Sequence, residues 1–155
     1  MATSTAAAET TLHVRRTFAA PRERVFHAWT DPQELSRWWC PDEYTNTGIE
    51  ADPRPGGLFR FGMRRSSDGH QATISGRYLE VKPPERVVYT WNWDGFFPGS
   101  PETRVTVEFL ESGSGTEVVL THENFPHQTM RDGHGKGWNA VFNRLAKALS
   151  SGGTT

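Results

Sequence analysis

The chain has little cysteine, no excess charge of either sign and no long apolar run. Its 155 residues include a single cysteine, Cys40, so an internal disulfide and a cysteine-based zinc site are both excluded. The flanking letters "WWCP" supply no acid or histidine that would activate a thiolate. We therefore interpret Cys40 as a small packing residue and not as a nucleophile.

The charges nearly cancel, with 17 Lys+Arg against 18 Asp+Glu. This balance is not typical of a protein that binds nucleic acid or an anionic membrane surface. No stretch approaches the roughly 18 apolar residues that a membrane helix needs, and "MATSTAAAETT" lacks the basic start and apolar run of a signal peptide. We expect no nucleic-acid partner, no membrane insertion and a cytoplasmic location.

Large aromatic side chains and turn residues are abundant. Hydrophobic residues make up only 35% of the chain, yet it has six tryptophans and nine phenylalanines, along with 15 glycines and 10 prolines. Large aromatic side chains together with many turn residues indicate short strands around an enclosed space, and not a dense aliphatic core.

The periodicity changes twice along the chain. "LHVRRTF" alternates as a half-buried strand does, and two short helices follow. Pro21 opens the first helix, Asp31 caps the second, and Pro41 ends it. A period of two then predicts six more strands, at residues 44–51, 58–64, 72–81, 86–93, 103–111 and 116–123.

The long C-terminal segment returns to a helical period. Short connections between the six strands favour an antiparallel meander, and only the C-terminal helix is large enough to cover the apolar face of the sheet. A twisted sheet that curls around one helix leaves a gap at one end, where we expect an internal cavity and the ligand site.

Several motifs occur in the order seen in one known family. They are "TDPQELSRWWCP", "RPGG", "PPER", "TEVVLTHENF" and "GKGW", and the similarity spans about Leu12 to Leu149. The chain resembles the proteins named for homology to the activator of the heat-shock protein 90 ATPase, within the START and polyketide-cyclase-like superfamily.

The resemblance implies an α+β helix-grip fold, in which a curved antiparallel sheet of about seven strands grips the C-terminal helix over a cavity. We expect one START-like domain at residues 11–150, with disordered tails at 1–10 and 151–155. Relatives in the superfamily bind lipids, sterols or polyketides, and a few catalyse cyclisation or dehydration. The resemblance covers only one domain of the eukaryotic cochaperone, so we expect no chaperone interaction.

The glycine-rich stretch "GHGKG" (133–137) matches neither phosphate-binding motif. Its lysine precedes Gly137 instead of Ser or Thr, and the three glycines are spaced two apart with no strand before them. Two interpretations stay open: the glycines fray the start of the helix, or they leave room beside Trp138 where the cavity opens.

The strand and helix periodicities predict that His122, His127 and His134 face the interior of the protein. No zinc-binding spacing or nearby carboxylate accompanies them. We expect no metal and no cofactor. No nucleophile–base pair is recognisable, so no catalytic residue is assigned.

The leading hypothesis is a binder of a small apolar or aromatic molecule, with planar rings as walls and histidines as polar handles. The alternative for most of these rings is that they simply form the core. The predicted ligand-binding residues are Trp39, Phe59, Phe61, Tyr78, Trp91, His122, His134, Trp138 and Phe142.

Two other functions are left open. One is a cyclase or dehydratase in which His122 moves protons. The other is a chaperone-associated accessory that binds a protein through Phe96 and Phe97, a pair that would equally serve as a lid or as half of a homodimer contact.

Overall fold

The computed structural model describes residues 10–40, 44–94, 102–125 and 128–152. Within these ranges a strand is followed by two short helices, six strands and one long helix, as the periodicity predicts. The elements are β1 (Leu12–Phe18), α2 (Arg22–Thr30), α3 (Pro32–Trp38), β2 (Tyr44–Ala51), β3 (Leu58–Arg65), β4 (Gln71–Lys82), β5 (Arg86–Asp94), β6 (Thr103–Ser112), β7 (Gly115–Glu123) and α4 (Gln128–Gly152).

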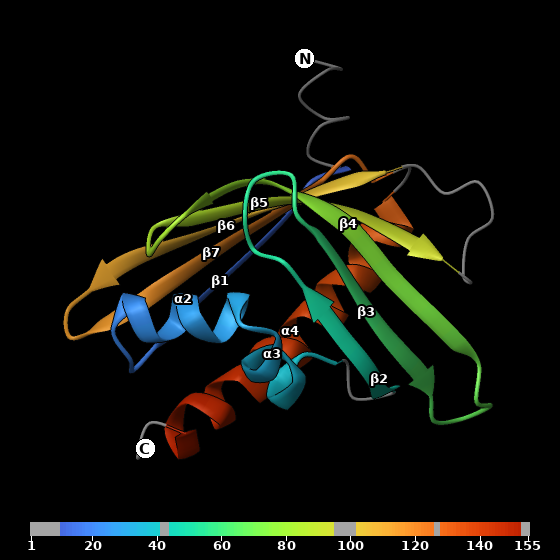
Figure 1. Cartoon of the computed structure of the whole chain (residues 1–155), viewed down its shortest axis with the longest axis horizontal. Helices are drawn as coiled ribbons and strands as arrows, with labels where there is room; N and C mark the ends of the chain where they lie inside the picture. The colour runs from blue at the N-terminus through green and yellow to red at the C-terminus, as the bar shows by residue number, and fades with distance from the viewer. Residues whose placement is uncertain (1–9, 41–43, 95–101, 126–127, 153–155) are drawn as a thin grey trace.

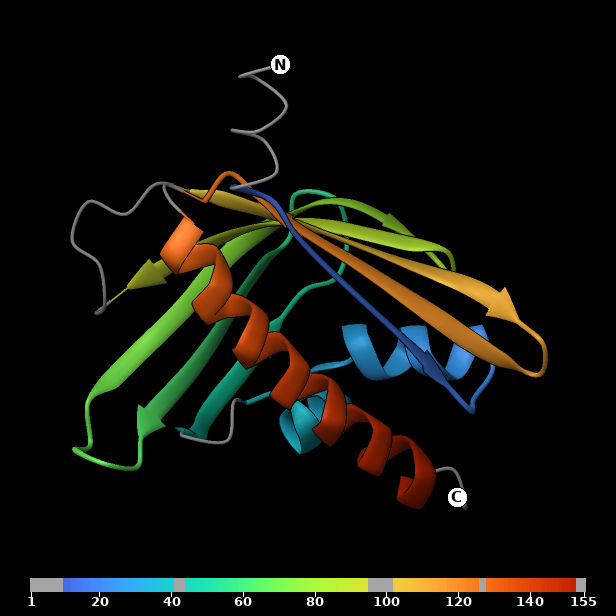
Figure 2. The same cartoon turned by 180° about the vertical axis from the view of Figure 1, so that it is seen from behind.

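The seven strands form one antiparallel sheet in the order β1-β7-β6-β5-β4-β3-β2. Strands β2 to β7 are a meander, and β1 joins it beside β7 with Val14 opposite Leu120. The sheet curls over the three helices, which all lie on its inner side (Figure 1). Seen from behind, α4 crosses the open side of the curved sheet (Figure 2). The predicted α+β helix-grip fold is therefore confirmed.

The alternating side chains place one core between the sheet and the helices. In β7 every second residue is buried, from Thr116 to His122, and β3 buries Phe59, Phe61 and Met63. This is the period of two that a strand has when one face meets the core and the other meets water.

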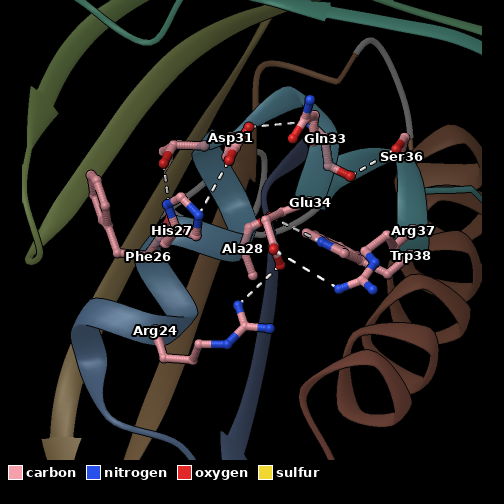
Figure 3. Close-up of polar contacts among 11 residues, drawn as sticks. Arg24, Phe26, His27, Ala28, Asp31, Gln33, Glu34, Ser36, Arg37 and Trp38 are labelled. Carbon is pink, nitrogen blue, oxygen red and sulfur yellow. Dashed lines mark hydrogen bonds and ion pairs between the residues drawn. The ribbon is translucent and has the colours of Figure 1, made fainter. Parts of the chain in front are cut away.

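Polar contacts hold α2 and α3 at a fixed angle (Figure 3). The Asp31 side chain accepts a hydrogen bond from the Gln33 backbone N–H at 3.0 Å, which caps α3. Trp38 Nε1 donates to the Ala28 carbonyl of α2 at 2.9 Å, and Arg24 pairs with Glu34 at 3.0 Å. This junction determines where the chain leaves α3, and so where Trp39 lies.

Helix α4 continues without a break through the glycine-rich stretch. A Cβ placed on Gly135 would lie 3.3 Å from Leu12 Cδ1, so this glycine lets α4 approach β1 closely. The helix ends at Gly152, two residues beyond the predicted domain boundary. The apolar pattern stops at Leu149, which is why the sequence did not indicate the last turn.

Candidate ligand-binding site

The structure brings all nine predicted site residues together on the inner side of the sheet. Eight of them are buried, and His134 is partly buried. They come from the end of α3 and from β3, β4, β5, β7 and α4. Contacts between rings connect them into one continuous group: Trp39–Phe61, Trp39–Trp91, Phe59–Phe61, Phe59–Tyr78, Trp91–Trp138, Trp91–His122, Trp91–His134 and Trp138–Phe142.

Four of these rings meet at the centre of the group, and we call them the tryptophan cluster: Trp39, Phe61, Trp91 and Trp138. Ring centroids are 4.7 Å apart for Trp39–Phe61, 5.9 Å for Trp39–Trp91 and 5.2 Å for Trp91–Trp138. The rings are tilted against one another and not stacked in parallel, an arrangement that aromatic quadrupoles favour.

His122 is held by hydrogen bonds on both ring nitrogens. Trp138 Nε1, which can only donate, lies 3.1 Å from His122 Nδ1, so Nδ1 accepts and carries no proton. The proton is therefore on Nε2, which donates to Thr103 Oγ1 at 2.8 Å. The Thr103 hydroxyl donates in turn to the Trp91 carbonyl at 3.0 Å. This chain links α4 to β5, β6 and β7 inside the core.

Burial keeps the two inner histidines neutral. It lowers the pKa of His122 well below 6.5, and the nearby His134 lowers it further. Burial also lowers the pKa of His134, although its Nδ1–H donates to the Met130 carbonyl at 2.9 Å and this bond opposes the shift. A neutral His122 with both nitrogens occupied is suited to holding structure, because a general base needs an unoccupied lone pair.

Three residues of this region were missed from the sequence, namely Trp29, Thr103 and Phe125, and Tyr89 lies there too. Trp29 stacks on Trp138 with centroids 6.3 Å apart, and its Nε1 donates to the Tyr89 hydroxyl at 3.4 Å. Phe125 contacts the rings of His122 and His134. Thr103 is in phase with the buried Val105 of the same strand, and that phase was the signal that could have revealed it.

The histidines do not form a metal centre in the part of the chain that the structure describes, where no group of three His, Cys, Asp or Glu side chains could hold an ion. His127 lies outside the described residues, as do Phe96 and Phe97 of the predicted lid. Of the helices in the described ranges, none is both long and apolar enough to cross a membrane.

A groove of about 720 Å³ lies over β2 to β5. Because exposed residues such as Leu58 and Arg60 line it, the groove opens on the outer face of the sheet, opposite the tryptophan cluster. Its walls carry Leu58, Arg60, Arg77 and Glu102, and among the nine predicted residues only Phe59 contributes to its lining. This groove is distinct from the predicted site.

A curved antiparallel sheet that grips a long C-terminal helix over an aromatic inner face defines the helix-grip class of proteins. The family model described as "Activator of Hsp90 ATPase homolog 1-like protein" matches residues 19–150, and the chain belongs to this family. The resemblance drawn from the motifs is thus confirmed. Membership supports a fold that typically binds hydrophobic ligands, and it specifies no particular ligand.

Solved structures from bacteria are similar over most of the chain. A protein from Chromobacterium violaceum is 28% identical, with a TM-score of 0.82 over 90% of this chain and 96% of the other. The AHSA1 protein from Silicibacter pomeroyi is 26% identical, with a TM-score of 0.80 over 90% and 97%. CalU16 from Micromonospora echinospora is 26% identical, with a TM-score of 0.69 over 90% and 76%. None of the curated proteins matches the chain.

Proposed function

We propose that the protein binds a small apolar or aromatic molecule on the inner side of the sheet, against the tryptophan cluster. The observation that carries this proposal is the convergence of four large rings from α3, β3, β5 and α4 at one place. An aromatic side chain of this size buries roughly 150–250 Å², so the four rings together make a large apolar surface on the inner side of the sheet. The family's fold typically binds hydrophobic molecules, which gives the proposal independent support.

The contacts also indicate which apolar ligands are favoured. Because the rings touch one another, a ligand that enters between them has to separate some of these contacts. Each aromatic pair contributes about 0.5–1.5 kcal/mol beyond the area it buries. A flat aromatic ligand that replaces a contact between two rings restores this aromatic-pair energy. A saturated ligand of equal size restores only the buried area. Aromatic ligands should therefore bind more tightly than their saturated counterparts.

Native mass spectrometry of freshly purified protein tests the proposal first, because a co-purifying small molecule would appear as a mass shift. A thermal-shift titration then compares 2-naphthol with its saturated counterpart, decahydro-2-naphthol. We expect stabilisation by 2-naphthol to exceed that by the saturated alcohol. A clean apo mass, together with no stabilisation by either compound, would contradict the proposal.

Matched variants locate the site. Phe61→Leu removes a ring of the tryptophan cluster, and Phe109→Leu removes an equally buried ring that packs against α2 instead. Both substitutions should lower stability to a similar degree, but only Phe61→Leu should weaken the binding of 2-naphthol. Equal weakening by the two variants would place the ligand elsewhere.

The other functions stay predictions. A proton-transfer role for His122 has no supporting observation, because Trp138 and Thr103 occupy its two nitrogens. A protein-binding or homodimer role for Phe96 and Phe97 concerns residues outside the described ranges. The cytoplasmic location is likewise an expectation.

A further inference from the structure

The fold supplies an acceptor for the indole N–H of three buried tryptophans. Trp29 donates to the Tyr89 hydroxyl at 3.4 Å, and Trp138 donates to His122 Nδ1 at 3.1 Å. Trp38 donates to the carbonyl of Ala28 at 2.9 Å (Figure 3). Buried indole groups are usually satisfied in this way, because an unpaired donor in the core is costly.

Trp39, the very next residue, differs from these three tryptophans. Its side chain is only 3% exposed, and its Nε1 is buried with no acceptor within hydrogen-bond distance among residues 10–40, 44–94, 102–125 and 128–152. The residue itself is well anchored, since its backbone N–H donates to the Leu35 carbonyl at 2.8 Å. Its ring belongs to the tryptophan cluster, against Phe61 and Trp91.

An orphaned donor at this place requires a reason. Leaving a buried N–H without a partner costs about 1–3 kcal/mol, and a phenylalanine would fill much of the same space without that cost. The simplest reason is that the acceptor belongs to a molecule that binds beside Trp39. We propose that Trp39 determines ligand specificity by donating its indole N–H to an oxygen of a flat aromatic ligand. This inference rests on the proposed function.

The surroundings of Trp39 restrict the chemistry of that oxygen. Among the residues that the structure describes, the rings in contact with it are Phe61, Trp91 and Trp138, which carry no charge. An ionised carboxylate or phosphate would be desolvated there without a cation, which is strongly unfavourable. The oxygen is therefore neutral, as in an aryl ketone, a quinone or an aryl ether.

A matched pair of ligands tests the inference directly. Fluorene and 9-fluorenone have nearly the same shape and differ in one carbonyl group. Isothermal titration should show 9-fluorenone binding about 2- to 10-fold more tightly than fluorene, the range that one net hydrogen bond supplies. In ¹H–¹⁵N spectra of the wild type, the Trp39 indole N–H should move downfield with 9-fluorenone and not with fluorene.

Two variants complete the test. Trp39→Phe keeps a ring but removes the donor, so it should bind the two compounds equally. Trp38→Phe removes a neighbouring indole that already donates to Ala28, so it should keep the preference for 9-fluorenone. The wild-type spectra decide the question if Trp39→Phe does not fold.

The outcomes separate the two proposals. If both compounds bind the wild type equally, or if the preference persists in Trp39→Phe, the role of Trp39 is overturned and the apolar site survives. If the wild-type indole signal of Trp39 stays in place while 9-fluorenone binds, the role is overturned as well. If neither compound binds, the proposed function fails and the inference fails with it.

Discussion

Replacing the outer glycines of "GHGKG" with alanine should stabilise the protein. In α4, a Cβ built on Gly133 or on Gly137 meets no atom of the described residues within 4 Å outside its own stretch of helix. Glycine inside a helix costs about 0.5–1 kcal/mol relative to alanine, because its unfolded backbone is freer. Gly133→Ala and Gly137→Ala should each add about that much to the free energy of unfolding, or about 1–2 kcal/mol together.

Gly135 provides the internal comparison. Its added Cβ would lie 3.3 Å from Leu12 Cδ1, so the leucine must shift by a few tenths of an ångström for alanine to fit. Part of the helix-propensity gain is then lost to this contact. We expect Gly135→Ala to stabilise less than either outer variant, and a pairing with Leu12→Val to recover part of the difference.

Urea unfolding at constant pH measures these changes, and an unchanged m-value would show that only stability has altered. A domain of this size gains about 2–4 °C in Tm per kcal/mol, so the double variant should melt about 2–8 °C higher. A double variant no more stable than the wild type would refute the reasoning. It would mean that residues 133–137 are not helical in the folded protein, which backbone chemical shifts would check independently.

Two further predictions concern His122 and His134. Trp138→Phe leaves the buried Nδ1 without its donor and should cost about 1–3 kcal/mol. Thr103→Val should cost a similar amount, and a double-mutant cycle should show coupling between the two, whereas additive losses would contradict a shared network. As pH falls, the unfolded chain protonates its histidines near 6.5 before the folded chain does, because burial lowers the pKa of His122 and His134 in the fold. The stability that the two neutral histidines contribute is fully present above about pH 6.5. Below that pH the free energy of unfolding falls by up to about 1.4 kcal/mol per pH unit per histidine. Urea unfolding at a series of pH values from about 7.5 to 5 measures this change. The free energy of unfolding should depend less steeply on pH in His134→Asn than in the wild type, and equal slopes would count against a lowered pKa of His134.

The arrangement of the sheet was predictable because local patterns determine it. Val105, Val107 and Phe109 alternate with polar residues, so the burial of one face of β6 follows from the sequence alone. Short turns between such strands leave antiparallel neighbours as the natural pairing, and the structure has that order. The pairing of β1 with β7 was not predicted, because their separation in sequence leaves no local signal.

The hydrogen bonds of the site were not predictable in the same way. "WW" at positions 38 and 39 presents two identical side chains, yet within the described part of the chain only Trp38 of this pair reaches an acceptor, the Ala28 carbonyl. Which indole succeeds depends on the angle between α2 and α3, and that angle depends on packing across the whole core. The network of Thr103, His122 and Trp138 likewise joins three elements whose spacing no periodicity describes.

The glycine-rich stretch now has a more specific explanation. Because three glycines oppose helix formation there, contacts with the sheet must hold this part of α4 in place. The contacts available are those of the candidate site itself: Trp138 with His122, His134 with Phe125, and Gly135 against Leu12. A ligand that separates Trp91 from Trp138 therefore acts on the least intrinsically stable turns of the helix. Ligand binding and the order of residues 133–137 are coupled through the same side chains, so alanine at 133 and 137 should stiffen the end of α4 that a ligand has to displace.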